Sequence, residues 1–333
     1  MKKKYLIDTA RLIIFVMLVG ILWLRLSSAA AATKNELLEK PKEKQKNSFK
    51  RFEITYESIW LYGTFYEEDA ISDGLGLGIE ATLKYKNRVR NRIHIKTGMY
   101  KGAFYLTPRT SIAGAYARTY FDKQRPGWIN MDSNVGIGLS AYDHISSDKI
   151  TLWGFDFCQN IFTHKKTDIA FDLLAGYYEY TMDVSISLDY PQDYSDAFGG
   201  KRSFAGPHYG FDLRMPFTLP KLEKHPFGLK LSFRYMPSLT MKGKNMFMSG
   251  LLDPGFSSKG KGSNLEGRAS LTFQITPNIF LEAAYNYYKF KVNKGNYINT
   301  TTSILGPPIP VNINLQKVEI NLHGPSLAAT VKF

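Results

Sequence analysis

Cysteine is nearly absent from this sequence, because Cys158 is the only one among 333 residues. A single thiol excludes an internal disulfide and a metal site built from cysteines. The spacings typical of metal ligands, activated nucleophiles and phosphate-binding loops are absent as well. We therefore expect no metal and no cofactor, and we interpret Cys158 as a small structural residue.

Long apolar runs are also scarce. After residue 24, no segment approaches the ~18 continuous apolar residues that a transmembrane helix needs. The one long run, residues 12–24, follows a basic start at Lys2, Lys3 and Lys4 and precedes the small residues 27–32. This order is typical of a secretory signal peptide. We expect residues 1–31 to be cleaved, with an uncleaved membrane anchor as the alternative.

Acidic residues are few compared with basic ones. The sequence has 29 Asp and Glu against 43 Lys and Arg, which gives a net charge of +14. For an exported chain we expect no nucleic-acid partner, and we expect this charge to face lipid phosphates or an anionic cell surface. Residues 32–51 are rich in Lys and Glu and poor in apolar residues, so they are predicted to form a disordered periplasmic tether.

From residue 52 onward, apolar and polar residues alternate. The alternation is clear in residues 52–62, 75–85, 93–105, 153–157, 169–177, 209–217, 227–235 and 265–275. A period of two indicates strands that face two different environments. The polar positions carry charges of both signs, and the aromatic content is 14%. Together these features predict an all-β fold, a transmembrane antiparallel up-and-down β-barrel over residues 52–333. A soluble β-sandwich is the alternative.

The last seven residues, 327–333, also alternate and end on Phe333. They resemble the closing strand of bacterial outer-membrane β-barrels. That resemblance implies outer-membrane lipid around the barrel and recognition of Phe333 by the barrel-assembly machinery. Upstream, Val318, Ile320 and Leu322 alternate in the opposite phase. We therefore predict a β-bulge or bend at residues 323–325 that shifts the register by one residue.

The turns predict the number of strands. Thr107-Pro and Thr276-Pro each start a tight turn, since proline presets φ for a turn. Long polar segments at 122–150, 188–203, 240–263 and 293–314 are predicted to be loops at the opposite end. From the first turn to the C-terminus this gives eight crossings. Three strand patterns lie upstream, at 52–66, 74–88 and 92–106. An even number of strands is needed there, because the N-terminus and the Thr107 turn are both expected on the periplasmic side. Ten strands, with 74–106 as one long bent strand, is our preferred count; a further strand at 135–143 would give twelve.

The order of segments from Lys101 to the C-terminus resembles the omptin family of outer-membrane proteases. The stretches that carry the resemblance are 101–103, 111–115, 155–157, 173–177, 275–278 and 282–285. The resemblance implies an active site at the barrel mouth, with two acids in one outer loop and an Asp–His pair in a later one. A carboxylate-oriented histidine would serve there as the general base for water.

The matching positions depart from this pattern. Asp132 fits the first acid, but Asn134 stands where the second acid is expected, and an amide cannot carry the negative charge. The later loop, 235–247, contains neither Asp nor His. The adjacent Asp143 and His144 are weak candidates for a substitute pair, although such a pair in a polar loop is usually only solvated.

Three functions remain open. The first is an omptin-like outer-membrane barrel of a Gram-negative bacterium without protease chemistry, serving a structural, adhesive or surface-binding role. The second is a divergent endopeptidase that uses Asp132 and an unrecognised base. The third is a small-solute porin, which is disfavoured because paired charges would fill a narrow ten-stranded lumen. Lys242 and Lys244, in a predicted outer loop, are weak candidates for binding lipopolysaccharide phosphates.

Overall fold

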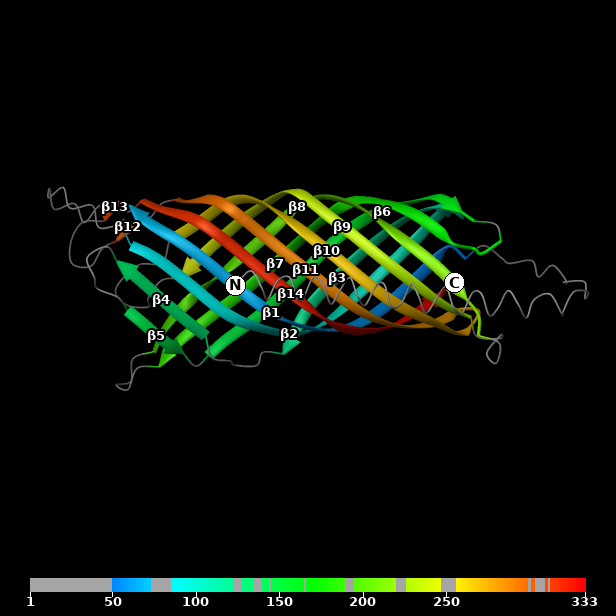
Figure 1. The fold of residues 1–333 in the computed structure, drawn as a ribbon, viewed down its shortest axis with the longest axis horizontal. Helices are drawn as coiled ribbons and strands as arrows, with labels where there is room; N and C mark the ends of the chain where they lie inside the picture. Colours follow the sequence, from blue (N-terminus) through cyan, green and yellow to red (C-terminus); the bar gives the residue numbers. More distant parts are fainter. Residues whose placement is uncertain are drawn as a thin grey trace, which may run out of the picture. The chain divides into compact units, whose positions relative to one another are not determined.

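The computed structural model consists of β-strands and the turns that join them (Figure 1). It describes residues 50–72, 85–121, 127–133, 139–143, 145–164, 166–189, 195–219, 226–246, 256–298, 301–302, 309–310 and 312–333. Residues 1–49, which contain the predicted signal peptide and tether, lie outside the described part. Among the described residues, no helix is long and apolar enough to cross a membrane.

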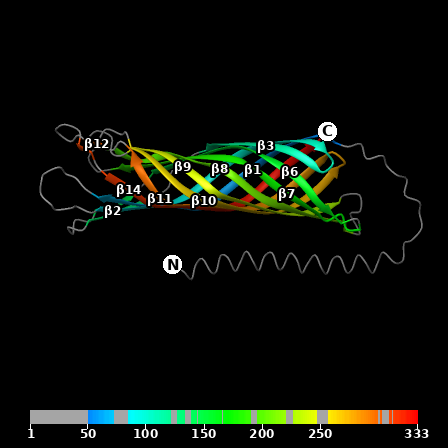
Figure 2. The same ribbon diagram turned by 90° about the horizontal axis from the view of Figure 1, so that it is seen from above.

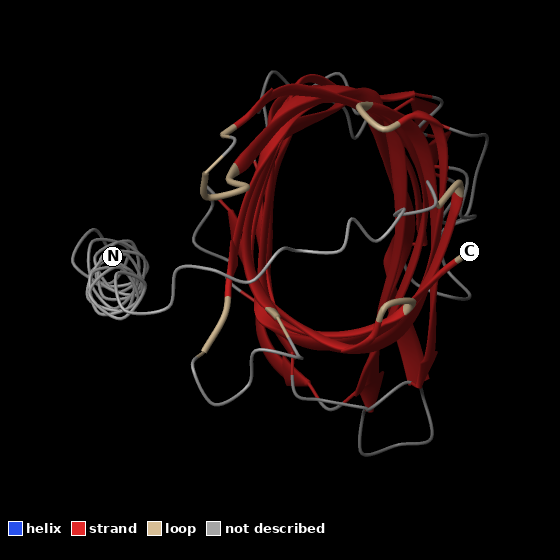
Figure 3. Cartoon of the chain, turned by 90° about the vertical axis from the view of Figure 1, so that its right-hand side faces the viewer, coloured by secondary structure: helices blue, strands red, loops and turns tan. Residues whose placement is uncertain are grey.

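Ten long strands form the barrel. They are β1 (Phe52–Ser72), β2 (Tyr85–Thr107), β3 (Thr110–Phe121), β6 (Ile145–Thr163), β7 (Ala170–Asp189), β8 (Ser195–Phe217), β9 (Phe227–Met246), β10 (Phe256–Thr276), β11 (Ile279–Ile298) and β14 (Asn312–Lys332). Every neighbouring pair is antiparallel, and β1 pairs with both β2 and β14, which closes the ring (Figure 3). The predicted ten-stranded up-and-down barrel is confirmed.

Two short strands explain why twelve was the competing count. β4 (Gly127–Ser133) pairs with the first residues of β2, and β5 (Leu139–Asp143) pairs with β4. This hairpin extends the sheet from β2 without entering the ring, so the predicted strand near 135–143 exists but adds no crossing. A separate small pair joins β12 (Thr301–Thr302) to β13 (Ile309–Pro310).

The two ends of the barrel differ. The C-terminus and the tight turns lie at one end, which we call the turn end, and β12 and β13 lie at the other, the far end (Figures 1 and 2). In the first predicted turn, the Thr107 hydroxyl oxygen accepts a hydrogen bond from the Arg109 amide at 3.1 Å. In the second, the Thr276 hydroxyl accepts from the amides of Asn278 at 3.3 Å and Ile279 at 3.1 Å. Both Thr-Pro turns are therefore stabilised by threonine side chains, as in ST-turns.

Outward-facing apolar side chains form a band around the turn-end half. Tyr56, Phe155, Leu281 and Leu327 are among its members, and each is about half exposed. Their neighbours along the strands, such as Glu57 and Asp156, are buried inside. This half follows the predicted pattern of apolar exterior and polar interior.

The far-end half reverses that pattern. Its interior is an apolar core in which Phe204, Leu239, Met241, Val292 and Ile320 are at most 1% exposed. The exterior positions between them are polar, as at Lys242 next to Met241. Much of the sequence predicted as long loops is therefore strand: β8 begins at residue 195, β9 runs to 246 and β11 to 298. The prediction of loop lengths was wrong, because strands were expected to show an apolar exterior face and the exterior face of these segments is polar.

The phase change in β14 has the same cause. Along β11, the partners Tyr285–Pro325, Asn286–Gly324 and Tyr287–His323 continue one register without a shift. The predicted bulge at residues 323–325 is therefore wrong. Val318, Ile320 and Leu322 face the core, whereas Leu327 faces outward, so the apolar face changes sides while the backbone continues. The register shift between β1 and β14 lies instead between Glu68 and Asp69.

Gly324 is required by the close approach of the first and last strands. A Cβ at this position would lie 1.8 Å from the Trp60 carbonyl oxygen, a contact that only backbone movement could relieve. We expect Gly324→Ala to lower the free energy of unfolding by about 1–3 kcal/mol, the usual cost of overpacking. Denaturant unfolding of the refolded barrel measures this loss.

Gly267 on β10 provides the matched control, because a Cβ there meets nothing within 4 Å. Gly267→Ala should be neutral or slightly stabilising, since alanine restricts the unfolded chain. Equal stability of the two variants would show that the strands do not approach as closely at Gly324 as described.

Candidate functional site

The residues predicted for a protease site lie on or beside the β4–β5 hairpin. Only the backbone of Asp132 and Asp143 is described, and Asn134 and His144 lie outside the described residues. Asp132 pairs with Lys86 near one end of the hairpin, while Asp143 pairs with Gly127 at the other end. The two aspartates are thus five residues apart along the ladder, roughly 17 Å at the usual rise of a strand. The hairpin register does not bring them together.

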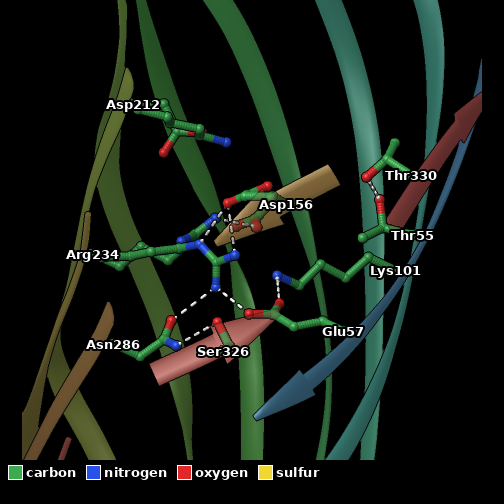
Figure 4. A network of polar contacts seen from close by, with 12 residues as sticks. Thr55, Glu57, Lys101, Asp156, Asp212, Arg234, Asn286, Ser326 and Thr330 are labelled. Carbon is green, nitrogen blue, oxygen red and sulfur yellow. Dashed lines mark hydrogen bonds and ion pairs between the residues drawn. The ribbon is translucent and has the colours of Figure 1, made fainter. Parts of the chain in front are cut away.

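The sequence pointed to a charged lumen, and two buried ion-pair clusters are found there (Figure 4). In the first, the Glu57 carboxylate is fully buried and accepts from the Lys101 ammonium at 2.5 Å and from the Arg268 guanidinium. Arg268 also donates to Glu282 at 2.7 Å and to the amide oxygen of Asn286 at 2.8 Å. These residues come from β1, β2, β10 and β11, so the cluster joins the two sides of the barrel seam.

The second cluster centres on Asp156. One carboxylate oxygen accepts from Tyr178 at 2.7 Å and Arg234 at 3.1 Å, and the other lies 2.5 Å from Nε2 of His208. The His208 ring stacks on Tyr178 at a centroid distance of 4.6 Å. His208 is only 3% exposed, and its Nδ1 has no partner among the described residues. With Tyr178 and Arg234, this buried His–Asp pair links the four strands β6 to β9. It cannot reach a substrate at the mouth.

A chamber of about 530 Å³ occupies the interior between these clusters and the turn end. Its walls extend to the turn residues Pro108, Arg109 and Asp168. At its inner end it is lined by Met99, Leu152, Tyr178, Tyr180 and Tyr288. Beyond these side chains the apolar core follows, so within the described residues the chamber ends there. Lys230 and Asp212 form an ion pair of 2.6 Å on its wall, and Cys158 also lines it.

The chemistry available in this interior is limited. Among the described residues, no group of three or more His, Cys, Asp or Glu side chains is placed to hold a metal ion. Several carboxylates that line the chamber are engaged with Arg or Lys, as Asp172 is with Arg214 at 2.8 Å, while Glu266 accepts from Tyr180 and from the Asn264 amide. A hydrolytic site of the type that the sequence resemblance implied would need a histidine base that water can reach. The interior charges instead form a set of pairs that bridges strands.

The lysines predicted to bind phosphates, Lys242 and Lys244, belong to β9. Lys242 is exposed on the outer surface of the far-end half, and the side chain of Lys244 is outside the described part. Sequence reasoning missed further exposed lysines near Lys242, because their segments were predicted to be loops. Alternation of lysine with buried residues, as at Lys259, Gly260 and Lys261, is the signal that could have located them.

Comparison with known proteins supports the fold. No protein-family model and no curated protein matches the sequence. Among solved structures, the chain is similar to OmpT, an outer membrane protease from Escherichia coli, with a TM-score of 0.59 and 12% identity, covering 89% of this chain and 99% of that one. The translocator domain of the autotransporter NalP from Neisseria meningitidis also matches, with a TM-score of 0.39 and 11% identity, covering 95% of this chain and 96% of that one.

At this identity the likeness to OmpT speaks for the fold and not for the chemistry. The ten-stranded antiparallel ring, the exterior apolar band and this likeness agree with one another. The chain therefore has the fold of an outer-membrane β-barrel, with the omptin-like scaffold that the sequence resemblance implied.

Proposed function

We propose that this protein is a closed outer-membrane barrel of a Gram-negative bacterium that acts through its outer surface, without protease activity. The observation that carries this proposal is the packing of the interior. The chamber at the turn end stops at a layer of tyrosines, and the core beyond it is almost fully buried. In the part of the chain that the structure describes, this interior offers no continuous path for solutes, and its chamber lies at the turn end, so we assign the function to the exterior and the far end.

The apolar band supports a placement in the outer membrane. Residues of the band lie in the turn-end half, and outer-membrane barrels place their short turns in the periplasm. The far-end half would then project beyond the lipid on the cell surface. Lipid is accordingly the proposed partner of the band.

Recognition of Phe333 by the barrel-assembly machinery stays a prediction. Phe333 is 59% exposed at the turn end, where its amide donates to the Phe52 carbonyl at 2.9 Å. Its side chain is thus available at the seam of the closed barrel. Deletion of Phe333 should lower the assembled fraction in cells; unchanged assembly would contradict this role.

The alternative of a divergent endopeptidase is tested by incubating the refolded barrel with a mixed peptide library. We expect no cleavage, because Asn134 replaces the second acid and the hairpin register separates Asp132 from Asp143. The same assay on Asp132→Ala supplies the matched control. Cleavage by the wild-type barrel that disappears in Asp132→Ala would overturn the non-proteolytic proposal.

A further inference from the structure

A group of exposed lysines covers one side of the far-end half. We call it the lysine face, and its described members lie on four consecutive strands: Lys201 on β8, Lys242 on β9, Lys259 and Lys261 on β10, and Lys291 and Lys294 on β11. All six are exposed, and five of them have a buried residue next to them in the chain; the exception is Lys294. The face is therefore fixed by the ladder of the barrel.

Two pairs of these lysines stand directly opposite each other across neighbouring strands. Lys242 is the register partner of Lys259, and Lys261 is the partner of Lys294. Like charges in such positions destabilise a sheet by a few tenths of a kcal/mol up to about 1 kcal/mol. Within the described residues, none of the four forms an ion pair, so no described carboxylate offsets this repulsion. An external anion would offset it.

Acidic side chains border the face but do not enter it. Glu179 on β7 accepts hydrogen bonds from Ser203 and Trp153, on the side next to β8. On the other side, Glu319 on β14 pairs with Lys317 at 2.7 Å and lies 3.8 Å from Lys289. Both carboxylates already have partners. These two carboxylates therefore do not neutralise the lysine face, which extends over β8–β11.

The height of the face above the apolar band selects the partner. On β8, Tyr209 is the last strongly exposed aromatic of the band, and Lys201 follows eight residues further toward the far end. With the usual rise and tilt of barrel strands, this distance is about 20 Å along the barrel axis. Phosphates at the membrane surface lie much closer to the band, so the face is placed to meet a molecule outside the bilayer.

We propose that the lysine face binds a polyanionic polysaccharide, a chain of sugars with sulfate or carboxylate groups, that lies across strands β8–β11. This inference rests on the proposed surface role of the barrel and names its partner. Cations repeat at the strand spacing of about 4.8 Å across the face and at two-residue steps along it, which suits a chain with many anionic groups. The described positions between the lysines, such as Ser203, Thr240 and Ser263, provide no aromatic ring on which bases could stack, which disfavours single-stranded nucleic acid.

The test uses the refolded full barrel in detergent micelles and heparin as a sulfated polysaccharide. The variant Lys242→Ser/Lys259→Ser/Lys261→Ser removes three charges from the face. The control, Lys96→Ser/Arg118→Ser/Lys317→Ser, removes three outward charges from β2, β3 and β14. We expect the wild type to bind heparin with an affinity that falls as salt rises, the face variant to lose at least tenfold in affinity, and the control to change less than threefold. Equal loss in both variants would overturn the proposal, because the binding would then depend on net charge alone.

Lipopolysaccharide and single-stranded DNA are tested as further ligands, so that failure of the polysaccharide partner can be told apart from failure of the surface-binding role. Binding of lipopolysaccharide, but not heparin, through the same lysines would overturn the polysaccharide partner and leave the surface-binding role intact. Single-stranded DNA that binds as tightly as heparin, with the same loss in the face variant, would also overturn the polysaccharide class. If none of the three ligands depends on the face, both the inference and the surface-binding role through this face fail.

Discussion

Replacement of Glu57 by alanine is expected to lower the free energy of unfolding by about 3–5 kcal/mol, the usual cost of removing one partner from a buried ion pair. Glu57 is fully buried and compensates both Lys101 and Arg268. Without its carboxylate, the Lys101 ammonium loses the acid at 2.5 Å, and Arg268 keeps one carboxylate, Glu282, and the amide oxygen of Asn286. Unfolding of the refolded barrel by guanidinium chloride, followed by tryptophan fluorescence, measures the loss.

Glu319 provides the comparison for this variant. It faces the exterior, where its partners Lys317 and Lys289 are each about one-third exposed and can be rehydrated. Glu319→Ala should therefore cost no more than about 1 kcal/mol, as surface ion pairs do. Similar losses in both variants would mean that Glu57 is not shielded from water and that the cluster does not bridge the seam.

Truncation of Phe290 to alanine is expected to destabilise the barrel by about 3–5 kcal/mol, since a buried aromatic leaves a cavity as well as losing its transfer free energy. The Phe290 ring is 1% exposed and packs against Tyr180 and Phe204 at centroid distances of 5.0 and 5.3 Å. These three rings come from β7, β8 and β11, so they join distant parts of the wall through the interior. The same unfolding measurement applies.

Phe155→Ala is the matched variant on the lipid side, where the ring is 51% exposed. Lipid or detergent fills the space that the ring leaves, so only the transfer free energy is lost and no cavity remains. The loss should be clearly smaller than for Phe290→Ala. Equal or larger destabilisation by Phe155→Ala would show that the far-end interior is not a packed core.

The sequence predicted the turn-end half well, for a physical reason. There the exterior faces lipid and the interior is polar, so stretches such as residues 153–157 alternate strongly, and Asp156 faces inward as this pattern implies. The Thr107 and Thr276 turns were readable because proline and threonine act locally. The count of ten strands followed from these two features.

The far-end half was predicted less well, because the environments of its two faces are exchanged. Met241 is buried and Lys242 is exposed, yet the segment lacks an apolar exterior stripe and was taken for a loop. The same exchange made Val318 and Ile320 look out of phase in β14. Partners in the charge clusters were beyond prediction too, because Glu57 and Arg268 meet only after the ring closes between β1 and β14. The lysine face likewise depends on the register between strands.

A barrel that is closed inside should carry no current, and the conductance of planar lipid bilayers tests this directly. Refolded wild-type barrel is added to one side, and insertion is verified by the resistance of the membrane-embedded strands to added protease. We predict no steady current above the baseline, because the chamber ends at Tyr178, Tyr180 and Tyr288 and the described core beyond it is apolar and buried. A steady current proportional to voltage, at a level that scales with the number of inserted barrels, would contradict a closed interior and favour a small-solute porin.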